Sequence, residues 1–333
     1  MKCTQNVQFP LRGMVVALLG LTMVACGGGG GGGGPAPVVK LDLSPANQDS
    51  VSHAVVGGAL GMGGADRPVA AAGVAVAQRR FVKAAHALKA NPMAIASQTF
   101  SCAVSGSYTV TIDDRDNNSA LTTGDVVTLA YAQCKETANL MIDGTTSMEL
   151  TNVLSSTDFD ARDTFTRFAT QEEQAGQVHR YTLDGTMLAG YREQSATRST
   201  MRLTADGEFT VGLVTPVFTD TVTLRSGFAQ DFADDTAAVP PSGSGGPGRS
   251  AVIVTGDLMS ANAGGWVAVK TDAAVVAYAG DPFPREGILQ VNGQHGEMHL
   301  TVRPDSLHVQ RDLDHNDDGA IEVATEVHWD WLV

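Results

Sequence analysis

The feature that most constrains the fold is a change of hydrophobic period at Thr99, after which apolar and polar residues alternate along the chain. Segment 108–112 alternates tyrosine, valine and isoleucine with threonine, and segment 127–131 repeats the pattern. A period of two places every second side chain on one face of a strand. The sequence therefore predicts a mainly β fold, an antiparallel meander that forms a curled sheet, a half-barrel or a sandwich, with one N-terminal helix.

Short turn signals separate these expected strands through to the C-terminus. An Asp or Asn followed by Gly occurs at Asp143-Gly144, Asp184-Gly185, Asp206-Gly207, Asn292-Gly293 and Asp318-Gly319. Some of these pairs are expected to form hairpin turns, and others to place a glycine inside a bent strand. The last expected strand carries Ile321, Val323, Val327, Trp329 and Trp331 on one face.

The remaining segments define the expected organisation of the chain. Apolar residues near helical spacing predict a helix over 67–92, and strands are expected over 99–235 and 251–333. The low-complexity segment 236–250 is interpreted as a loop within one β body rather than a linker between two. The glycine cluster 57–64 lacks the register and the lysine of a phosphate-binding loop.

The N-terminus has the pattern of an export signal. Two basic residues precede an apolar run, Met14–Ala25, that is too short to span a membrane as a helix, and Cys26 follows it. Residues 21–26 resemble the lipobox of bacterial lipoproteins, which implies a signal peptide over 1–25 and a lipidated Cys26. Eight consecutive glycines then predict a flexible tether, assigned here to 26–66.

The resemblance to Gram-negative lipoproteins also implies an address. Gly27 rather than Asp after the lipidated cysteine implies sorting to the outer membrane, on its periplasmic or its surface face, with the membrane as a partner through the N-terminal lipid. The alternative is an ordinary cleaved signal with an incidental cysteine. The chain has 22 basic and 36 acidic residues and a net charge of −14, which disfavours nucleic acid as a partner.

Two cysteines, Cys102 and Cys134, remain once Cys3 leaves with the signal and Cys26 carries lipid. In an oxidising envelope we expect them to form a disulfide. The alternatives, a thiolate metal site or a catalytic thiol, lack a nearby histidine or a further cysteine.

Segment 114–125 has the oxygen spacing of a calcium loop. It offers Asp114, Asp116, Asn118 and Asp125 at loop positions 1, 3, 5 and 12, and it resembles loops of the EF-hand and dockerin type. Ser119 stands where these loops have glycine, and strands rather than helices are expected on both sides. The alternative is a polar hairpin loop that binds nothing.

A second such segment begins at Asp314. Asp314, Asn316 and Asp318 occupy positions 1, 3 and 5, and Glu322 occupies position 9. Position 12 is Thr325, so Glu326 would have to supply the last carboxylate. We expect calcium as a weakly bound structural ion at both loops, with an Asp-Gly hairpin as the alternative for the second.

No catalytic signature stands out from the composition. The chain has no Gly-x-Ser-x-Gly motif in a strand-turn-helix setting and no HExxH motif, and His295, Glu297 and His299 are interpreted as one solvated strand face. The sequence favours a non-enzymatic envelope lipoprotein with a binding or structural role toward a protein or small molecule. The alternatives are an envelope hydrolase that uses an Asp/Glu pair, and a carrier of a lipid or small ligand.

Overall fold

The protein is described from a computed structural model that covers residues 39–60, 97–118, 120–155, 157–174, 177–239, 248–279, 281 and 283–332. The expected signal peptide, the lipidated Cys26, the polyglycine segment and the 67–92 helix lie outside these residues. Among the described residues, no helix is long and apolar enough to cross a membrane.

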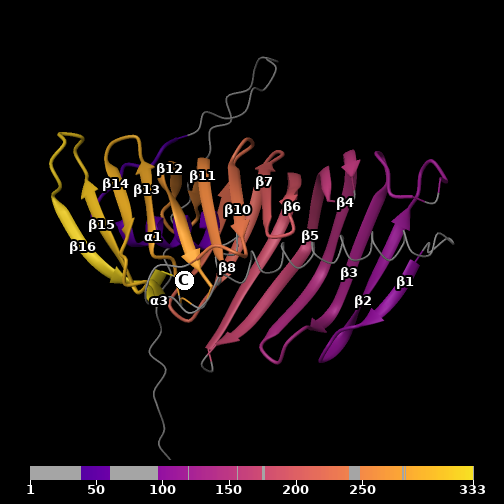
Figure 1. The fold of residues 1–333 in the computed structure, drawn as a ribbon. Helices are drawn as coiled ribbons and strands as arrows, with labels where there is room; N and C mark the ends of the chain where they lie inside the picture. Colours follow the sequence, from indigo (N-terminus) through magenta and orange to yellow (C-terminus); the bar gives the residue numbers. More distant parts are fainter. Residues whose placement is uncertain are drawn as a thin grey trace, which may run out of the picture. The chain divides into compact units, whose positions relative to one another are not determined.

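The fold is a single antiparallel sheet of sixteen strands with short helical segments, which confirms the expected fold class (Figure 1). The helical elements are α1 (Gln48–His53), the π-helix η1 (Ala54–Leu60) and α3 (Trp329–Leu332). The strands are β1 (Ser97–Ser101), β2 (Ser105–Asp113), β3 (Val126–Lys135), β4 (Leu140–Ser155), β5 (Asp158–Gln174), β6 (Gln177–Ser195), β7 (Arg198–Ala205), β8 (Phe209–Val214), β9 (Thr219–Leu224), β10 (Ala229–Asp235), β11 (Arg249–Ser260), β12 (Gly265–Tyr278), β13 (Glu286–Asn292), β14 (Glu297–Val302), β15 (His308–Asp314) and β16 (Val323–His328).

The described strands follow one another as a meander, and two breaks account for the departures from sequential order among them. β6 pairs with β7 along one half and with β8 along the other, so β7 and β8 act as one strand interrupted near Gly207. β9 and β10 are interrupted in the same way near Gly227, and both pair with β11. Segment 236–250 connects β10 to β11, and these two strands pair directly with each other. The strands before and after the segment therefore belong to one sheet.

A line of irregular residues crosses the sheet and bends its long strands. Gly144 interrupts the pairing of β4 with β5, and its φ of 91° lies in the left-handed region. A Cβ atom at Gly144 would overlap the carbonyl oxygen of Arg167, which itself has a positive φ in a bulge of β5. The same juxtaposition of a positive-φ glycine with a bulged or broken neighbour recurs across the sheet, at Gly106 against Gln133, at Gly185 against Glu208 and Phe209, at Gly256 against Phe228, and at Gly287 against Val275.

These positions explain the mixed behaviour of the Asp-Gly pairs. Gly144 and Gly185 lie inside β4 and β6, whereas Gly207, Gly293 and Gly319 lie in turns between strands. Bulges increase the local twist and bend of a strand. The sheet can therefore curl enough for one of its faces to close over an apolar core.

The helical segment Gln48–Leu60 packs on this core, where the sequence led us to expect part of a tether reaching residue 66. Every residue of η1 is buried, and the segment contacts β8, β9 and β11. A Cβ atom at Gly58 would lie 2.7 Å from Cγ1 of Val222, so glycine permits the close approach of helix and strand. The side-chain amide of Gln230, itself fully buried, donates a hydrogen bond to the carbonyl of Ala59 near the end of η1. Gly57 and Gly58 of the glycine cluster therefore allow the helical segment to pack closely against the sheet.

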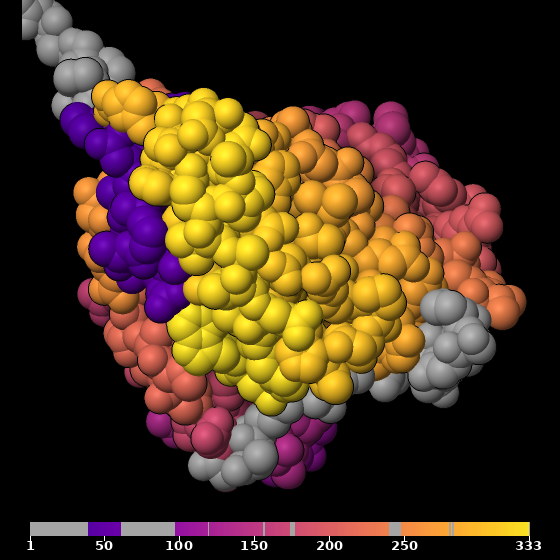
Figure 2. All heavy atoms as spheres, turned by 90° about the vertical axis from the view of Figure 1, so that its left-hand side faces the viewer, coloured from indigo at the N-terminus to yellow at the C-terminus, as the bar shows by residue number. Residues whose placement is uncertain are grey.

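The C-terminal strand ends earlier than the alternation predicts. β16 stops at His328, and the chain turns into α3, where Trp329 is buried and Trp331 packs against the core. The ring of Trp331 lies 4.3 Å from that of His53 in α1. Ile321, expected on the apolar face, precedes the strand and is half exposed. The turn therefore places Trp331 against α1. Figure 2 shows the described segments nearest the two ends of the chain side by side, in indigo and yellow.

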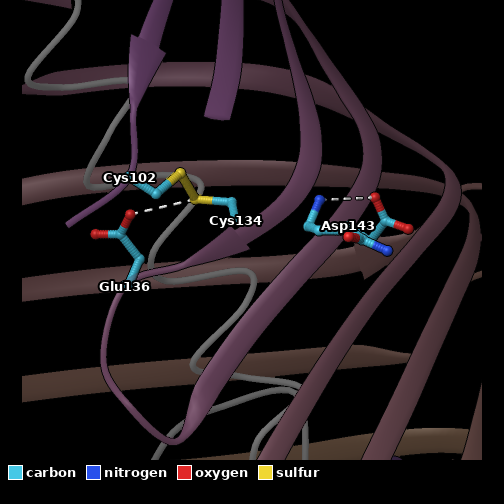
Figure 3. Close-up of a disulfide and its surroundings, with 5 residues drawn as sticks. Cys102, Cys134, Glu136 and Asp143 are labelled. Carbon is cyan, nitrogen blue, oxygen red and sulfur yellow. Dashed lines mark hydrogen bonds between the residues drawn. A yellow bond between two sulfur atoms is a disulfide. The ribbon is translucent and has the colours of Figure 1, made fainter. Parts of the chain in front are cut away.

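The expected disulfide joins Cys102 to Cys134, with Cα atoms 5.5 Å apart (Figure 3). Cys102 lies in the turn between β1 and β2, and Cys134 lies near the end of β3. The Glu136 carboxylate lies 3.2 Å from Sγ of Cys134. The bond therefore fixes the base of the β2–β3 hairpin to the edge of the sheet.

Replacing Gly144 by alanine should destabilise the fold more than replacing Gly207 by alanine. The two glycines have φ angles of 91° and 92°, but a Cβ atom at Gly207 has no neighbour within 4 Å. Gly207→Ala should cost about 1–3 kcal/mol for the positive φ alone, and Gly144→Ala should exceed that value because of the added overlap. Chemical denaturation measures both, and equal losses would contradict the role of close approach at the bend.

Removing the disulfide with Cys102→Ser and Cys134→Ser together should lower the free energy of unfolding by on the order of 3.5–4 kcal/mol. Without the disulfide, the loop between the two cysteines is no longer closed, so the unfolded chain gains conformational entropy. Denaturation with and without reductant measures this in the wild-type chain. The double variant serves as the control, because reductant should no longer change its stability.

Candidate functional site

The first acidic loop forms the tip of the β2–β3 hairpin. Asp114, Asp116 and Asp125 each offer a carboxylate oxygen, and the three oxygens lie within 4.8 Å of one another. Two oxygens that bind one calcium ion at about 2.4 Å can be at most about 4.8 Å apart. The structure therefore brings together three of the four side chains that the sequence singled out here.

Asp125 is the buried member of this loop and organises its backbone. Its Oδ1 accepts a hydrogen bond from the backbone N–H of Arg115 at 3.0 Å, and its Oδ2 accepts one from that of Thr122 at 2.7 Å. Backbone hydrogen bonds from Gly124 to Leu150 and from Leu150 to Asp125 anchor the loop on β4. Asp125 thus holds both ends of the loop in place.

The other oxygens of the loop are more exposed. The hydroxyl of Thr122 donates to Asp116 at 2.9 Å, and this hydrogen bond, with the backbone N–H of Asn118, lowers the pKa of Asp116 although desolvation opposes the shift. Asn118, the fourth predicted ligand, accepts the backbone N–H of Ala120 at 2.7 Å through Oδ1. Its amide oxygen therefore already has one protein donor.

The second acidic loop connects β15 to β16. Asp314, Asp318 and Glu322 place their carboxylate oxygens within 4.8 Å of one another. The amide oxygen of Asn316, also predicted as a ligand, accepts the backbone N–H of Asp318 at 3.0 Å. The structure therefore gathers three carboxylates in the second loop as well.

Asp314 is largely buried, and the loop backbone turns toward it. Desolvation raises the pKa of Asp314, but backbone N–H groups, Gly319 at 2.8 Å among them, outweigh it and hold the pKa below its usual range. Glu322 accepts the backbone N–H of His315 at 2.9 Å. The geometry of the loop thus favours the anionic form of Asp314.

Neither candidate for position 12 of the second loop points into it. Thr325 accepts a hydrogen bond from Nε of Arg311 at 3.1 Å, within the β15–β16 pairing. Glu326 pairs with Arg303 at 3.5 Å instead of reaching the loop. Any ion there would have to complete its shell with backbone carbonyls and water.

The donor set of both loops consists of oxygen atoms, which suits a hard cation such as calcium rather than a transition metal. The arrangement can therefore act as a clip that holds a loop together. Among the described residues, His295, Glu297 and His299 join no group of three side chains able to share a metal. His295 bonds to Asp42, and His299 pairs with Glu297.

Sequence reasoning did not identify a cleft on the polar face of the sheet. The cleft has a volume of about 370 Å³ and spans β5, β6, β7, β10 and β11. Gly190 lines the cleft without a side chain that would fill it. The charged residues of the lining form two ion pairs, Asp160 with Arg192 at 2.5 Å and Asp231 with Arg202 at 3.3 Å. Strand register brings these residues together, and no local pattern in the sequence signals it.

Comparison of the chain with protein-family models, with curated proteins and with solved structures finds no match.

Calcium should raise the thermal midpoint of the protein. For a dissociation constant of about 10⁻⁴–10⁻³ M, 10 mM calcium would stabilise the folded state by about 1.4–2.7 kcal/mol per site. Scanning calorimetry with calcium and with chelator measures this effect in the wild type, in Asp114→Asn and in Asp318→Asn. Each substitution should remove the contribution of its own loop.

Glu193→Gln provides the control, since Glu193 is an exposed carboxylate outside both loops. It should retain the full calcium response. If 10 mM calcium leaves the thermal midpoint of the wild type unchanged, neither loop binds calcium at that concentration, and both are polar turns.

Proposed function

We propose that this protein is a non-enzymatic lipoprotein of the bacterial cell envelope, anchored in the outer membrane through Cys26. Its β body would be held off the membrane by the glycine tether and would bind a protein or small molecule or serve a structural role. Calcium at the two acidic loops would stabilise that body.

The observation that carries this proposal is the disulfide between Cys102 and Cys134. Disulfides form and persist in oxidising compartments such as the bacterial periplasm and the cell surface. A Cys102–Cys134 disulfide agrees with the address implied by the lipobox-like segment and the eight glycines that follow Cys26. Two independent features of the chain, one at each side of the tether, thus point to the same compartment.

The alternative of a hydrolase finds little support in the cleft that spans β5, β6, β7, β10 and β11. A general acid requires a carboxyl group whose pKa is raised. Burial raises the pKa of Asp160, but hydrogen bonds from Asn152 and Arg192 outweigh it, and the pKa falls below its usual range. Asp231 is likewise paired with an arginine. No tryptophan lines the cleft as a sugar platform.

The alternative of a lipid carrier meets a different obstacle. A half-barrel carrier presents the apolar face of its strands to the ligand. Here η1 covers that face at β8, β9 and β11, with Gly58 in close contact with Val222. The apolar residues of these strands therefore contribute to a packed core.

Lipidation of Cys26 should be visible as incorporation of labelled palmitate into the full chain when it is expressed in a Gram-negative host. The wild-type protein should fractionate with the outer membrane. Cys26→Ser should lose the label and the membrane association, because a single lipid-bearing residue provides the anchor.

Cys3→Ser is the matched control, as Cys3 lies within the expected signal and should leave both readouts unchanged. Membrane association of Cys26→Ser equal to that of the wild type would overturn the proposed anchor. Specific turnover of a substrate that disappears with one carboxylate substitution would overturn the non-enzymatic role.

A further inference from the structure

His308 and His328 lie directly opposite each other on the last two strands of the sheet. They are register partners in the β15–β16 pairing, and their ring centroids are 5.1 Å apart with the ring planes at 90°. Opposed residues on neighbouring antiparallel strands point to the same face. The two imidazoles therefore form a pair, although twenty positions separate them in the sequence.

A carboxylate orients each ring from outside the pair. Oδ2 of Asp305 lies 2.6 Å from Nδ1 of His308, and Oδ1 of the same carboxylate accepts the backbone N–H groups of Leu307 and His308. On the other strand, Nδ1 of His328 accepts a hydrogen bond from the backbone N–H of Asp330 at 3.2 Å, and Oδ2 of Asp330 lies 3.3 Å from the same Nδ1. The Nδ1 atoms thus face the carboxylates.

The pair is also held by its surroundings. The ring of Phe283 lies 6.4 Å from that of His328 and stacks on Trp329 at 5.9 Å. The backbone N–H of Trp329 donates to the carbonyl of Leu307, which joins α3 to the turn before β15. The two histidine side chains remain 35% and 39% exposed, so an ion in solution can reach them.

The Nε2 atoms of both histidines have no hydrogen-bond partner among the described residues. An imidazole that binds a metal through one nitrogen almost always donates its other N–H to a carboxylate, a backbone carbonyl or water. Asp305 occupies the position of such a partner for His308. At His328, metal binding through Nε2 moves the ring proton to Nδ1, where Oδ2 of Asp330, at 3.3 Å, would accept it in place of the backbone contact. We propose that His308 and His328 bind a divalent transition-metal ion through their Nε2 atoms, with Asp305 and Asp330 as positioning residues and water completing the coordination.

The chemical class of the ion follows from the ligands. Neutral imidazole suits zinc, copper and nickel, whereas calcium requires oxygen donors. Among divalent first-row ions, Cu²⁺ binds a given nitrogen site most tightly. The proposed site therefore differs in chemistry from the two acidic loops, and saturating calcium should not block it.

The test uses the full chain, purified in detergent without a histidine tag and kept in millimolar calcium. Titration with Zn²⁺ by calorimetry should show one site, and Cu²⁺ should give an electron paramagnetic resonance spectrum with two nitrogen ligands. His308→Ala and His328→Ala should each weaken binding by at least about tenfold. Asp305→Asn should weaken it to a smaller extent, with the thermal midpoint of the metal-free chain unchanged.

His299→Ala is the matched control. His299 is similarly exposed and also contacts a carboxylate, Glu297, but Gln290 and Asp312 rather than a histidine lie opposite it. This variant should bind both ions as the wild type does.

A second measurement on the unmodified chain does not depend on whether the variants fold. In a sample labelled with ¹⁵N-histidine, Zn²⁺ should shift the Nε2 resonances of two histidines, and both Nδ1 atoms should be protonated in the metal-bound state. Shifts at other histidines, a copper spectrum with one nitrogen, or equal affinity in the His308→Ala/His328→Ala double variant would each overturn the proposal.

Discussion

The close approach of backbone to backbone along one line of the sheet is the constraint on which the rest of the structure depends. Strands of 16 to 19 residues, such as β4, β5 and β6, would form a broad sheet with both faces in water. At Gly144 the neighbouring strand comes so near that a side chain has no room, and at Gly185 a Cβ atom would lie only 3.0 Å from the carbonyl oxygen of Glu208. Bulges on the adjoining strands add twist at the same places. The sheet bends there, and its apolar face becomes the interior of the molecule.

Curling alone would leave that interior open, and the helical segment before the sheet supplies the missing packing. η1 lies against β8, β9 and β11, and the ring of His53 in α1 contacts the rings of Phe218 and Trp331. Burial lowers the pKa of His53, so the folded state favours the neutral imidazole and gains stability as the pH rises through 6.5. Arg311 of β15, which is buried, bonds to the exposed Asp49 of α1. The described segments nearest the two ends of the chain are thereby joined through one cluster.

The sequence predicted those features that are encoded locally. Alternation identified strands, the Asp-Gly pairs marked bends and turns, and oxygen spacing located both groups of carboxylates. Features that depend on contacts between distant segments were not predictable in this way. From the sequence, Gly57 and Gly58 indicated a flexible segment. In the structure they pack closely against Leu213 and Val222. The pairing of His308 with His328 depends on the register of β15 and β16, which no short-range pattern reveals.

The two hairpins near the ends of the sheet carry most of the candidate chemistry, and there is a physical reason for this. An edge strand has backbone groups without a neighbour and loses the support that inner strands receive from both sides. On the β1 side, the disulfide fixes the base of the β2–β3 hairpin while Asp125 organises its tip. On the β16 side, the carboxylates around Asp314 lie at the tip of the β15–β16 hairpin, and the paired histidines lie at its base. Each end therefore combines an acidic loop with a second potential crosslink, covalent at one end and, on our proposal, metal-mediated at the other. Because the acidic loops offer oxygen and the histidines offer nitrogen, the ions that stabilise one would not compete for the other.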